Sequence, residues 1–221
     1  MGSDMRVNSL KSVLLLCVLS SSTHGISSQP AGVSTSSSPA VLDTDGHEIQ
    51  TGSKYIILAA QDSNAGLALA PKDRPCPLYV TVENLEGYNG LPVKFMPAEP
   101  RQQPIIAQST DVNVAFYTAT ICVQSTAWKL GSVDETTGRR YVVSGGATGR
   151  PGADTVSSWF RVEKQGGSAY RLVFCPGVCS ACKVACGNVG VFNENGKRWL
   201  GLTDEPLVVR FKKCCGNWIS F

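Results

Sequence analysis

Apolar and polar residues alternate over short segments of this chain, and no long stretch keeps the period of an amphipathic helix. Such alternation is typical of strands with one buried face. The segments that show it are residues 55–60, 78–83, 112–117, 127–130, 140–144, 159–163, 170–174, 190–192, 198–202 and 207–212. The pattern predicts an all-β protein with little helix.

A weak internal repeat organises these segments into three units. Each unit is an alternating strand, a turn or loop, and a second strand that ends in alternating apolar residues. The units cover residues 66–82, 140–162 and 198–211. They predict a threefold β architecture, and a closed barrel of this kind leaves no exposed sheet edge. Turn-forming pairs punctuate the chain, among them Asn89-Gly90, Gly166-Gly167 and Asn195-Gly196.

The first residues have the order of a secretory signal peptide. Arg6 and Lys11 precede an apolar run at residues 13–19, and small polar residues follow up to Gly25. The run is far shorter than the roughly 20 residues that span a bilayer. We therefore expect a signal peptide at residues 1–25 and a secreted product (extracellular space, apoplast or vacuole) that does not bind membranes.

The remaining chain predicts one domain behind a short spacer. Residues 26–40 are rich in Ser, Pro, Gly and Ala, which is typical of a flexible leader. Residues 41–221 are long enough to form one domain with a full hydrophobic core. The formal net charge of +3 is too small to favour nucleic acid or an anionic membrane as a partner.

A cluster of four cysteines lies within residues 175–186, at spacing C-x3-C-x2-C-x3-C. Such a cluster is either a zinc site or a pair of disulfides. Loss of the signal peptide removes Cys17, and the cysteines that remain are even in number: Cys76, Cys122, Cys175, Cys179, Cys182, Cys186, Cys214 and Cys215. An even count in an oxidising compartment favours disulfides, but the spacing alone leaves their pairing open.

The sequence does not favour catalysis. His47 is the one histidine after the predicted signal peptide, and it falls in a predicted turn. A G-x-S-x-G elbow is absent, which argues against a Ser-His-Asp hydrolase. Asp43, Asp45 and Gly46 share the start of a calcium loop but lack its remaining positions, so a β-turn is the better interpretation. We expect neither an enzyme nor a bound metal or cofactor.

Several motifs resemble landmarks of the plant Kunitz-type (soybean trypsin inhibitor) family. They lie at residues 41–49, 55–57, 76–78, 109–112, 125–128, 157–160 and 170–176. The match extends over residues 41–211, and the cysteine cluster together with residues 157–161 is most similar to the miraculin-like branch. The resemblance implies a β-trefoil fold, which agrees with the threefold repeat.

The same resemblance implies the disulfides Cys76–Cys122, Cys175–Cys186 and Cys179–Cys182. Cys214 and Cys215 have no place in that pattern, and adjacent cysteines form only a strained bridge. They would form such a bridge, link two chains or stay reactive. We expect a monomer, with a disulfide dimer through Cys214 or Cys215 as the alternative.

The resemblance also implies a defence-related protease inhibitor that blocks its target with an exposed, substrate-like loop. The corresponding residues, called here the inhibitory loop, are Met96, Pro97, Ala98, Glu99, Pro100, Arg101, Gln102 and Gln103. Prolines restrict the backbone to extended conformations, so a loop of this kind loses little entropy on binding. The target would be an endopeptidase of the serine or cysteine type.

Three residues depart from the trypsin inhibitors of the family. Glu99 occupies the position of the primary specificity residue, and the carboxylate in a trypsin-like pocket would repel it. Pro100 follows it, whereas Arg101 could enter the cleft in a shifted register. Thr51 occupies the place of an Asn that braces the loop. The alternatives are a non-inhibitory trefoil protein that binds an α-amylase or a carbohydrate, and a storage or stress protein.

Overall fold

The computed structural model describes residues 38–62, 65–83, 89–99 and 104–214. The predicted signal peptide, most of the predicted leader, and Cys215 lie outside the described residues. The described elements are β1 (Tyr55–Ala59), β2 (Gly66–Ala70), β3 (Tyr79–Glu83), β4 (Pro92–Pro97), β5 (Asp111–Phe116), β6 (Lys129–Val133), β7 (Arg140–Val143), the 3₁₀ helix η1 (Ala153–Ser158), β8 (Phe160–Gly166), β9 (Ala169–Phe174), β10 (Gly187–Glu194), β11 (Lys197–Thr203) and β12 (Val208–Lys213).

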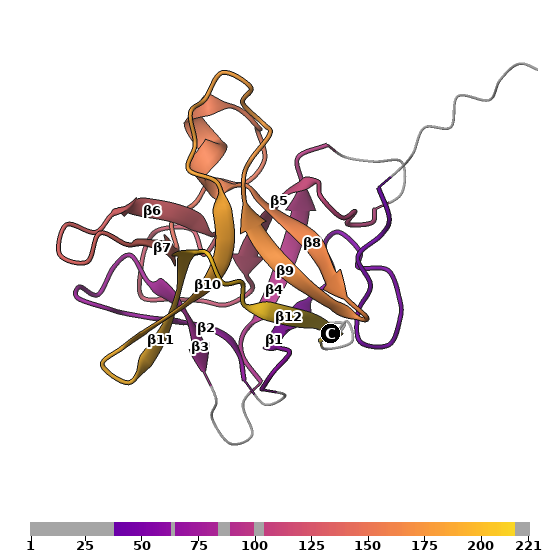
Figure 1. Ribbon diagram of the computed structural model, residues 1–221, viewed down its shortest axis with the longest axis horizontal. Coiled ribbons are helices and arrows are strands. Elements are labelled where there is room, and N and C mark those ends of the chain that lie inside the picture. The colour runs from indigo at the N-terminus through magenta and orange to yellow at the C-terminus, as the bar shows by residue number, and fades with distance from the viewer. Residues whose placement is uncertain (1–37, 63–64, 84–88, 100–103, 215–221) are drawn as a thin grey trace, which may run out of the picture. The chain divides into compact units, whose positions relative to one another are not determined.

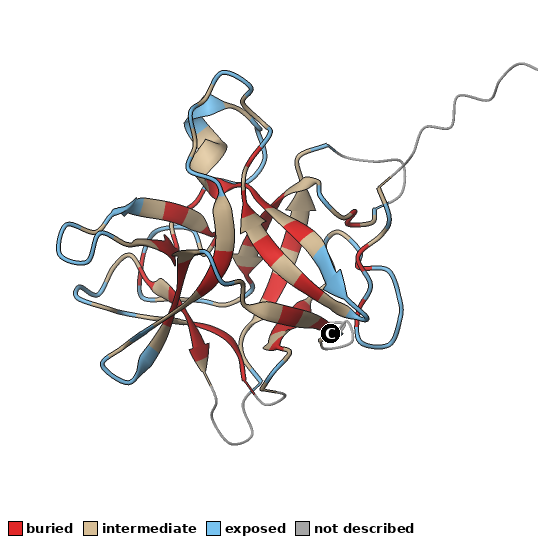
Figure 2. Ribbon diagram, viewed as in Figure 1, coloured by how far each residue is buried: buried red, intermediate tan, exposed pale blue. Residues whose placement is uncertain are grey.

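Six of the strands close into a barrel. Following the antiparallel pairs around the ring gives the order β1, β4, β5, β8, β9, β12 and back to β1. Closure leaves these strands without a free edge in the ring, as the threefold repeat predicted. The inward residues alternate along each strand, and Figure 2 shows the buried positions along the barrel strands and the exposed ones at hairpin tips and loops.

The other six strands form three hairpins, called here the hairpin cap: β2–β3, β6–β7 and β10–β11. The hairpins also pair with one another, through Tyr79 and Val143, Tyr141 and Gly201, and Trp199 and Thr81. Their tips spread to the left and lower left in Figure 1. A six-stranded barrel joined to a triangle of hairpins is the β-trefoil fold, so the predicted fold class is confirmed.

Aromatic side chains fill the centre of the hairpin cap. The Tyr79 ring lies 5.6 Å from the Tyr141 ring and 5.8 Å from the Trp199 ring, centroid to centroid, in edge-to-face contact. Tyr141 and Trp199 are 2% and 5% exposed. Such pairs stabilise a protein beyond the area that they bury. The cap is therefore a second packed region beside the barrel core.

Charged groups lie around the rim of these aromatic rings. Glu194 accepts hydrogen bonds from the Tyr141 hydroxyl and from Arg139, and the Lys72 ammonium lies 3.4 Å from its carboxylate. Burial of Glu194 by itself would raise its carboxyl pKa, but these donors and the Lys72 charge outweigh burial and hold the pKa below its usual value. The charges of the cap thus neutralise one another.

Every predicted strand segment overlaps an observed strand, although β4 had no counterpart among the predicted segments. Val93 and Phe95 are fully buried and alternate with half-buried neighbours, so the signal for β4 was present. The strand extends through Met96 and Pro97, which were predicted to belong to the inhibitory loop. Asn195 and Gly196 both have positive φ, at 49° and 75°, as expected for the tight turn between β10 and β11.

Three disulfides bridge the described residues: Cys76–Cys122, Cys175–Cys186 and Cys179–Cys182. These are the pairs that the family resemblance implied. Cys214 is also disulfide-bonded. The interchain link considered for Cys214 or Cys215 stays a prediction.

Candidate functional site

The inhibitory loop connects β4 to β5. Met96 and Pro97 are the last residues of β4, where they pair with Asn113 and Val112 of β5. The chain leaves the sheet at Ala98, whose N–H donates to the carbonyl of Asp111 at 2.8 Å. Glu99 is exposed, while Pro100, Arg101, Gln102 and Gln103 lie outside the described residues. The loop therefore projects from a strand pair that is hydrogen-bonded up to Ala98. Ala98 and Pro104, where the loop leaves and rejoins the described chain, are called here its first and second foot.

The second foot of the loop rests on the N-terminal segment. The Thr51 N–H donates to the carbonyl of the exposed Pro104 at 2.6 Å, and Gln50 forms a bridge with Ile105. Ile106, fully buried, then ties the chain to Ile49. The sequence placed Thr51 where the trypsin inhibitors carry their bracing Asn, and the structure does bring Thr51 to the loop. The Thr51 hydroxyl oxygen is buried and has no hydrogen-bond partner within the part of the chain that the structure describes.

The chain between the second foot and β5 is held by short-range and cross-strand hydrogen bonds. Ser109 adopts a left-handed conformation, with φ at 57°, and its N–H donates to the carbonyl of Val162 at 2.9 Å. The Thr110 hydroxyl donates to the carbonyl of Ala107 at 2.8 Å. A left-handed non-glycine residue is uncommon and persists where its surroundings fix the backbone. The return path of the loop is thus tied to β8.

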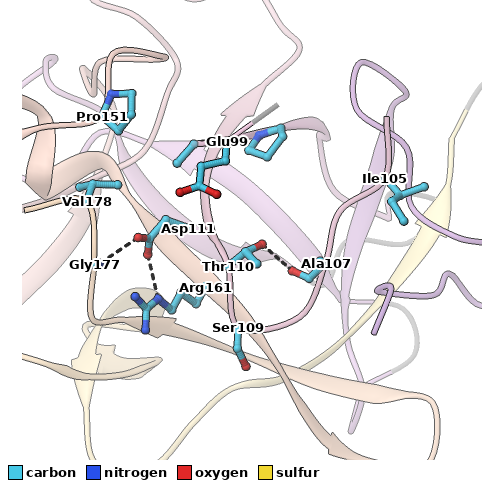
Figure 3. A pocket seen from close by; sticks show the side chains of 12 residues that line it. Glu99, Ile105, Ala107, Ser109, Thr110, Asp111, Pro151, Arg161, Gly177 and Val178 are labelled. Carbon is cyan, nitrogen blue, oxygen red and sulfur yellow. Dashed lines mark hydrogen bonds and ion pairs between the residues drawn. The ribbon is translucent and has the colours of Figure 1, made fainter. Parts of the chain in front are cut away.

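A pocket of about 380 Å³ lies at the base of the inhibitory loop. Its walls come from three connections between strands, and Figure 3 shows the side chains that line it. Pro97, Ala98 and Glu99 form one wall, Pro151 a second, and Gly177 with Val178 a third. The Glu99 side chain extends into this pocket (Figure 3). Glu99 therefore forms part of its own protein's pocket wall.

These three connections, residues 98–110, 145–152 and 175–186, are called here the loop face. The last of them carries the disulfides Cys175–Cys186 and Cys179–Cys182. At the floor of the pocket, Arg161 Nε lies 2.8 Å from Asp111 Oδ1, and the Gly177 N–H donates to Asp111 Oδ2 at 2.8 Å. Figure 3 shows this arrangement.

No role was predicted from the sequence for Asp111, Arg161 or Gly177. Asp111 lies within residues 109–112, one of the motifs that resemble the family, which was the available signal. Their contact joins β5, β8 and the connection after β9, positions that lie 50 and 66 residues apart. Such a contact depends on the folded barrel, so the sequence pattern does not reveal it.

The turn that includes the remaining histidine is closed by a carboxylate. Asp43 Oδ1 accepts the N–H groups of Asp45 and His47, each at 2.9 Å, and the Asp43 side chain is 1% exposed. The His47 side chain is 77% exposed. The carboxylate of Asp43 thus stabilises a turn, as the sequence analysis interpreted it.

A sequence profile described as "Kunitz_legume: Trypsin and protease inhibitor" matches residues 41–213. The chain is 39% identical over 182 residues to miraculin from Synsepalum dulcificum, covering 78% of this chain and 82% of miraculin. It is 42% identical over 179 residues to an alpha-amylase/subtilisin inhibitor from Oryza sativa subsp. japonica, covering 79% and 84%.

The fold also matches solved structures. One is a Kunitz-type cysteine protease inhibitor from potato, PCPI-3, with a TM-score of 0.71 and 28% sequence identity. The alignment covers 81% of this chain and 100% of the potato protein. Within the described residues, the structure contains no helix with the length and apolar character needed to cross a membrane.

Proposed function

The chain belongs to the plant Kunitz family of trypsin and protease inhibitors, and on that premise we propose that it is a secreted inhibitor that blocks an endopeptidase with its inhibitory loop. The family is non-enzymatic, and its members include inhibitors of trypsin, of cysteine proteases and of amylase and subtilisin. The order of charged, apolar and small residues at 1–25 supports secretion. Serine and cysteine proteases are both candidate targets.

The observation that carries this proposal is the anchoring of the loop at both feet. Ala98 is hydrogen-bonded to Asp111 at one foot, and Pro104 accepts from Thr51 at the other. The intervening residues contain a further proline, Pro100. A loop that is fixed at both ends and stiffened between them loses little conformational freedom when it enters a protease cleft. That is the physical requirement for a substrate-like inhibitor.

We further propose Arg101, rather than Glu99, as the residue that enters the specificity pocket of the target. The Glu99 side chain extends into the pocket of its own protein (Figure 3), whereas a specificity residue must project into the partner. Arg101 is the basic residue of the inhibitory loop, and a trypsin-like pocket contains a carboxylate that would pair with it. This register favours a protease that cleaves after basic residues.

Titration of the purified protein against trypsin, chymotrypsin, subtilisin and papain tests both proposals. We expect trypsin to be inhibited at near-stoichiometric amounts, and Arg101→Ala to abolish that inhibition while Glu99→Ala retains it. Inhibition that requires Glu99 and not Arg101 would overturn the register. If none of these proteases is inhibited, the inhibitor proposal fails.

The second candidate function is inhibition of an α-amylase. It is favoured by the 42% identity to the alpha-amylase/subtilisin inhibitor from rice. An α-amylase belongs in the same titration, with the Arg101→Ala variant as its control. Amylase inhibition that survives this substitution would place amylase binding outside the inhibitory loop. An inert protein in every assay would leave a carbohydrate-binding, storage or stress role.

A further inference from the structure

Asp111 connects three segments of the loop face. It is the first residue of β5, immediately after the connection that carries the inhibitory loop. Its carboxylate accepts from Arg161 Nε through Oδ1 and from the Gly177 N–H through Oδ2, each at 2.8 Å, while its carbonyl accepts from the Ala98 N–H at 2.8 Å. The Asp111 side chain is 10% exposed. One residue thus binds the first foot of the loop, β8 and the disulfide-bonded connection.

Gly177 lies in the connection closed by Cys175–Cys186, so its position is fixed by that disulfide. A Cβ atom at this position would lie 2.4 Å from Arg161 Nη2 and 3.2 Å from Asp111 Oδ2. A side chain at this position would push the Arg161 guanidinium group away from the carboxylate, so glycine leaves room for both contacts of Asp111. Hydrogen bonds to a charged acceptor are about twice as strong as neutral ones, which favours a stable link.

Asn113, two residues further along β5, makes a similar connection. Its Oδ1 accepts the Gly149 N–H and its Nδ2 donates to the carbonyl of Ser158, both at 2.8 Å. Asn113 is fully buried. Side chains two residues apart lie on the same face of a strand, so β5 holds two neighbouring connections of the loop face through adjacent positions on that face.

We propose that Asp111 is a positioning residue that couples the disulfide-bonded connection to the first foot of the inhibitory loop. At the other foot the Thr51 N–H donates to the Pro104 carbonyl, while the Thr51 hydroxyl has no hydrogen-bond partner among the described residues. Asp111 fixes the Ala98 foot through its carbonyl, while its carboxylate is held by Arg161 and Gly177. This role rests on the proposed inhibitory function, but the link itself is a property of the free protein.

Two substitutions break the link from opposite sides. Asp111→Asn turns one carboxylate oxygen into a donor, which then faces either Arg161 or the Gly177 N–H without an acceptor. Gly177→Ala displaces Arg161 from the carboxylate. The matched control is Glu163→Gln, because Glu163 forms an ion pair of the same kind in the same barrel, with Arg171 at 2.7 Å between β8 and β9.

The variants are compared by the inhibition constant for the protease that the wild type inhibits best and by the rate at which bound protease cleaves the loop. We expect Asp111→Asn and Gly177→Ala to raise the inhibition constant about tenfold or more and to speed cleavage, while Glu163→Gln changes neither. Thermal unfolding is measured alongside. A lower melting temperature with unchanged inhibition by the folded protein would mean a merely structural role and overturn the proposal.

Hydrogen exchange of the Ala98 amide in the free protein separates this inference from the proposed function. We expect exchange about ten times faster in both variants than in the wild type or Glu163→Gln. Unchanged exchange would overturn the link even if the wild type is a strong inhibitor. Faster exchange in a protein that inhibits no protease would retain the link and reject the inhibitory function.

Discussion

The hairpin cap and the loop face satisfy their polar groups in different ways. At the rim of the packed rings in the cap, Glu194 joins other side chains and accepts from Arg139 and Tyr141. On the loop face, two side chains hold irregular backbone: Asp111, besides pairing with Arg161, accepts the Gly177 N–H, and Asn113 accepts the Gly149 N–H. The first arrangement stabilises a packed layer of strands. The second fixes the path of irregular backbone while leaving its outer surface exposed to a partner.

This contrast shows how one trefoil can combine a stable packed layer with a surface for binding a partner. A packed layer resists change because every lost atom leaves a cavity. A connection without regular structure has no backbone ladder of its own, so it needs individual side chains to hold it. Substitutions in the cap should therefore change stability alone, and substitutions at the loop supports should change inhibition more than stability.

The largest expected effect is a loss of stability from the cap. Trp199→Ala removes a 5% exposed ring from its contact with Tyr79 and should lower the free energy of unfolding by about 3–5 kcal/mol. Urea denaturation measures this change. Ile121→Ala, at an 84% exposed position, is the control and should stay within about 0.5 kcal/mol. A higher inhibition constant for the folded Trp199→Ala protein would contradict the separation of stability in the cap from inhibition at the loop face.

A smaller effect should appear as a gain at the second foot of the loop. Thr51→Asn introduces a side-chain amide at a residue whose backbone N–H binds the Pro104 carbonyl and whose hydroxyl has no hydrogen-bond partner among the described residues. We expect the inhibition constant for trypsin to fall about tenfold, which corresponds to one added buried hydrogen bond. Enzyme titration measures it, with Thr51→Val as the control of similar shape. Equal inhibition by the two variants would show that this foot needs no brace.

The smallest effect is a pH dependence confined to the cap. The folded pKa of Glu194 lies below its usual value, so its contribution is present above the unfolded pKa of about 4.3 and is lost as the pH falls through the folded pKa. Below about pH 4.3, the free energy of unfolding of the wild type should therefore fall further than that of Glu194→Gln, by about 1 kcal/mol. Thermal unfolding at a series of pH values measures it. Parallel pH profiles would contradict the assignment.

The sequence predicted the trefoil well because alternation and repeats are local signals. Tyr141 and Trp199 lie in the segments 140–144 and 198–202, whose strands could be located from the sequence directly. The floor of the pocket could not be predicted in the same way. Asp111, Arg161 and Gly177 are brought together by strand pairing across the barrel. Their chemistry depends on a backbone approach that the order of residues does not encode locally.

At β4, the predicted and the observed strands differ in a segment that ends with a proline. Pro97 is the last residue of β4 and also belongs to the inhibitory loop, so this residue has two roles. Its pairing with Val112 shows that the sheet extends to the first foot of the loop. The loop that leaves the sheet is consequently shorter and better anchored than the sequence alone indicated.

The measurement that tests the account most directly is hydrogen exchange of the protein alone and bound to the protease that it inhibits best. The account predicts that binding slows exchange at residues 98–110 and at Gly177, while exchange at the hairpin tips, residues 134–139 and 195–196, stays unchanged. Slower exchange at the hairpin tips with none on the loop face would contradict the account, because the protease would then bind the hairpin cap.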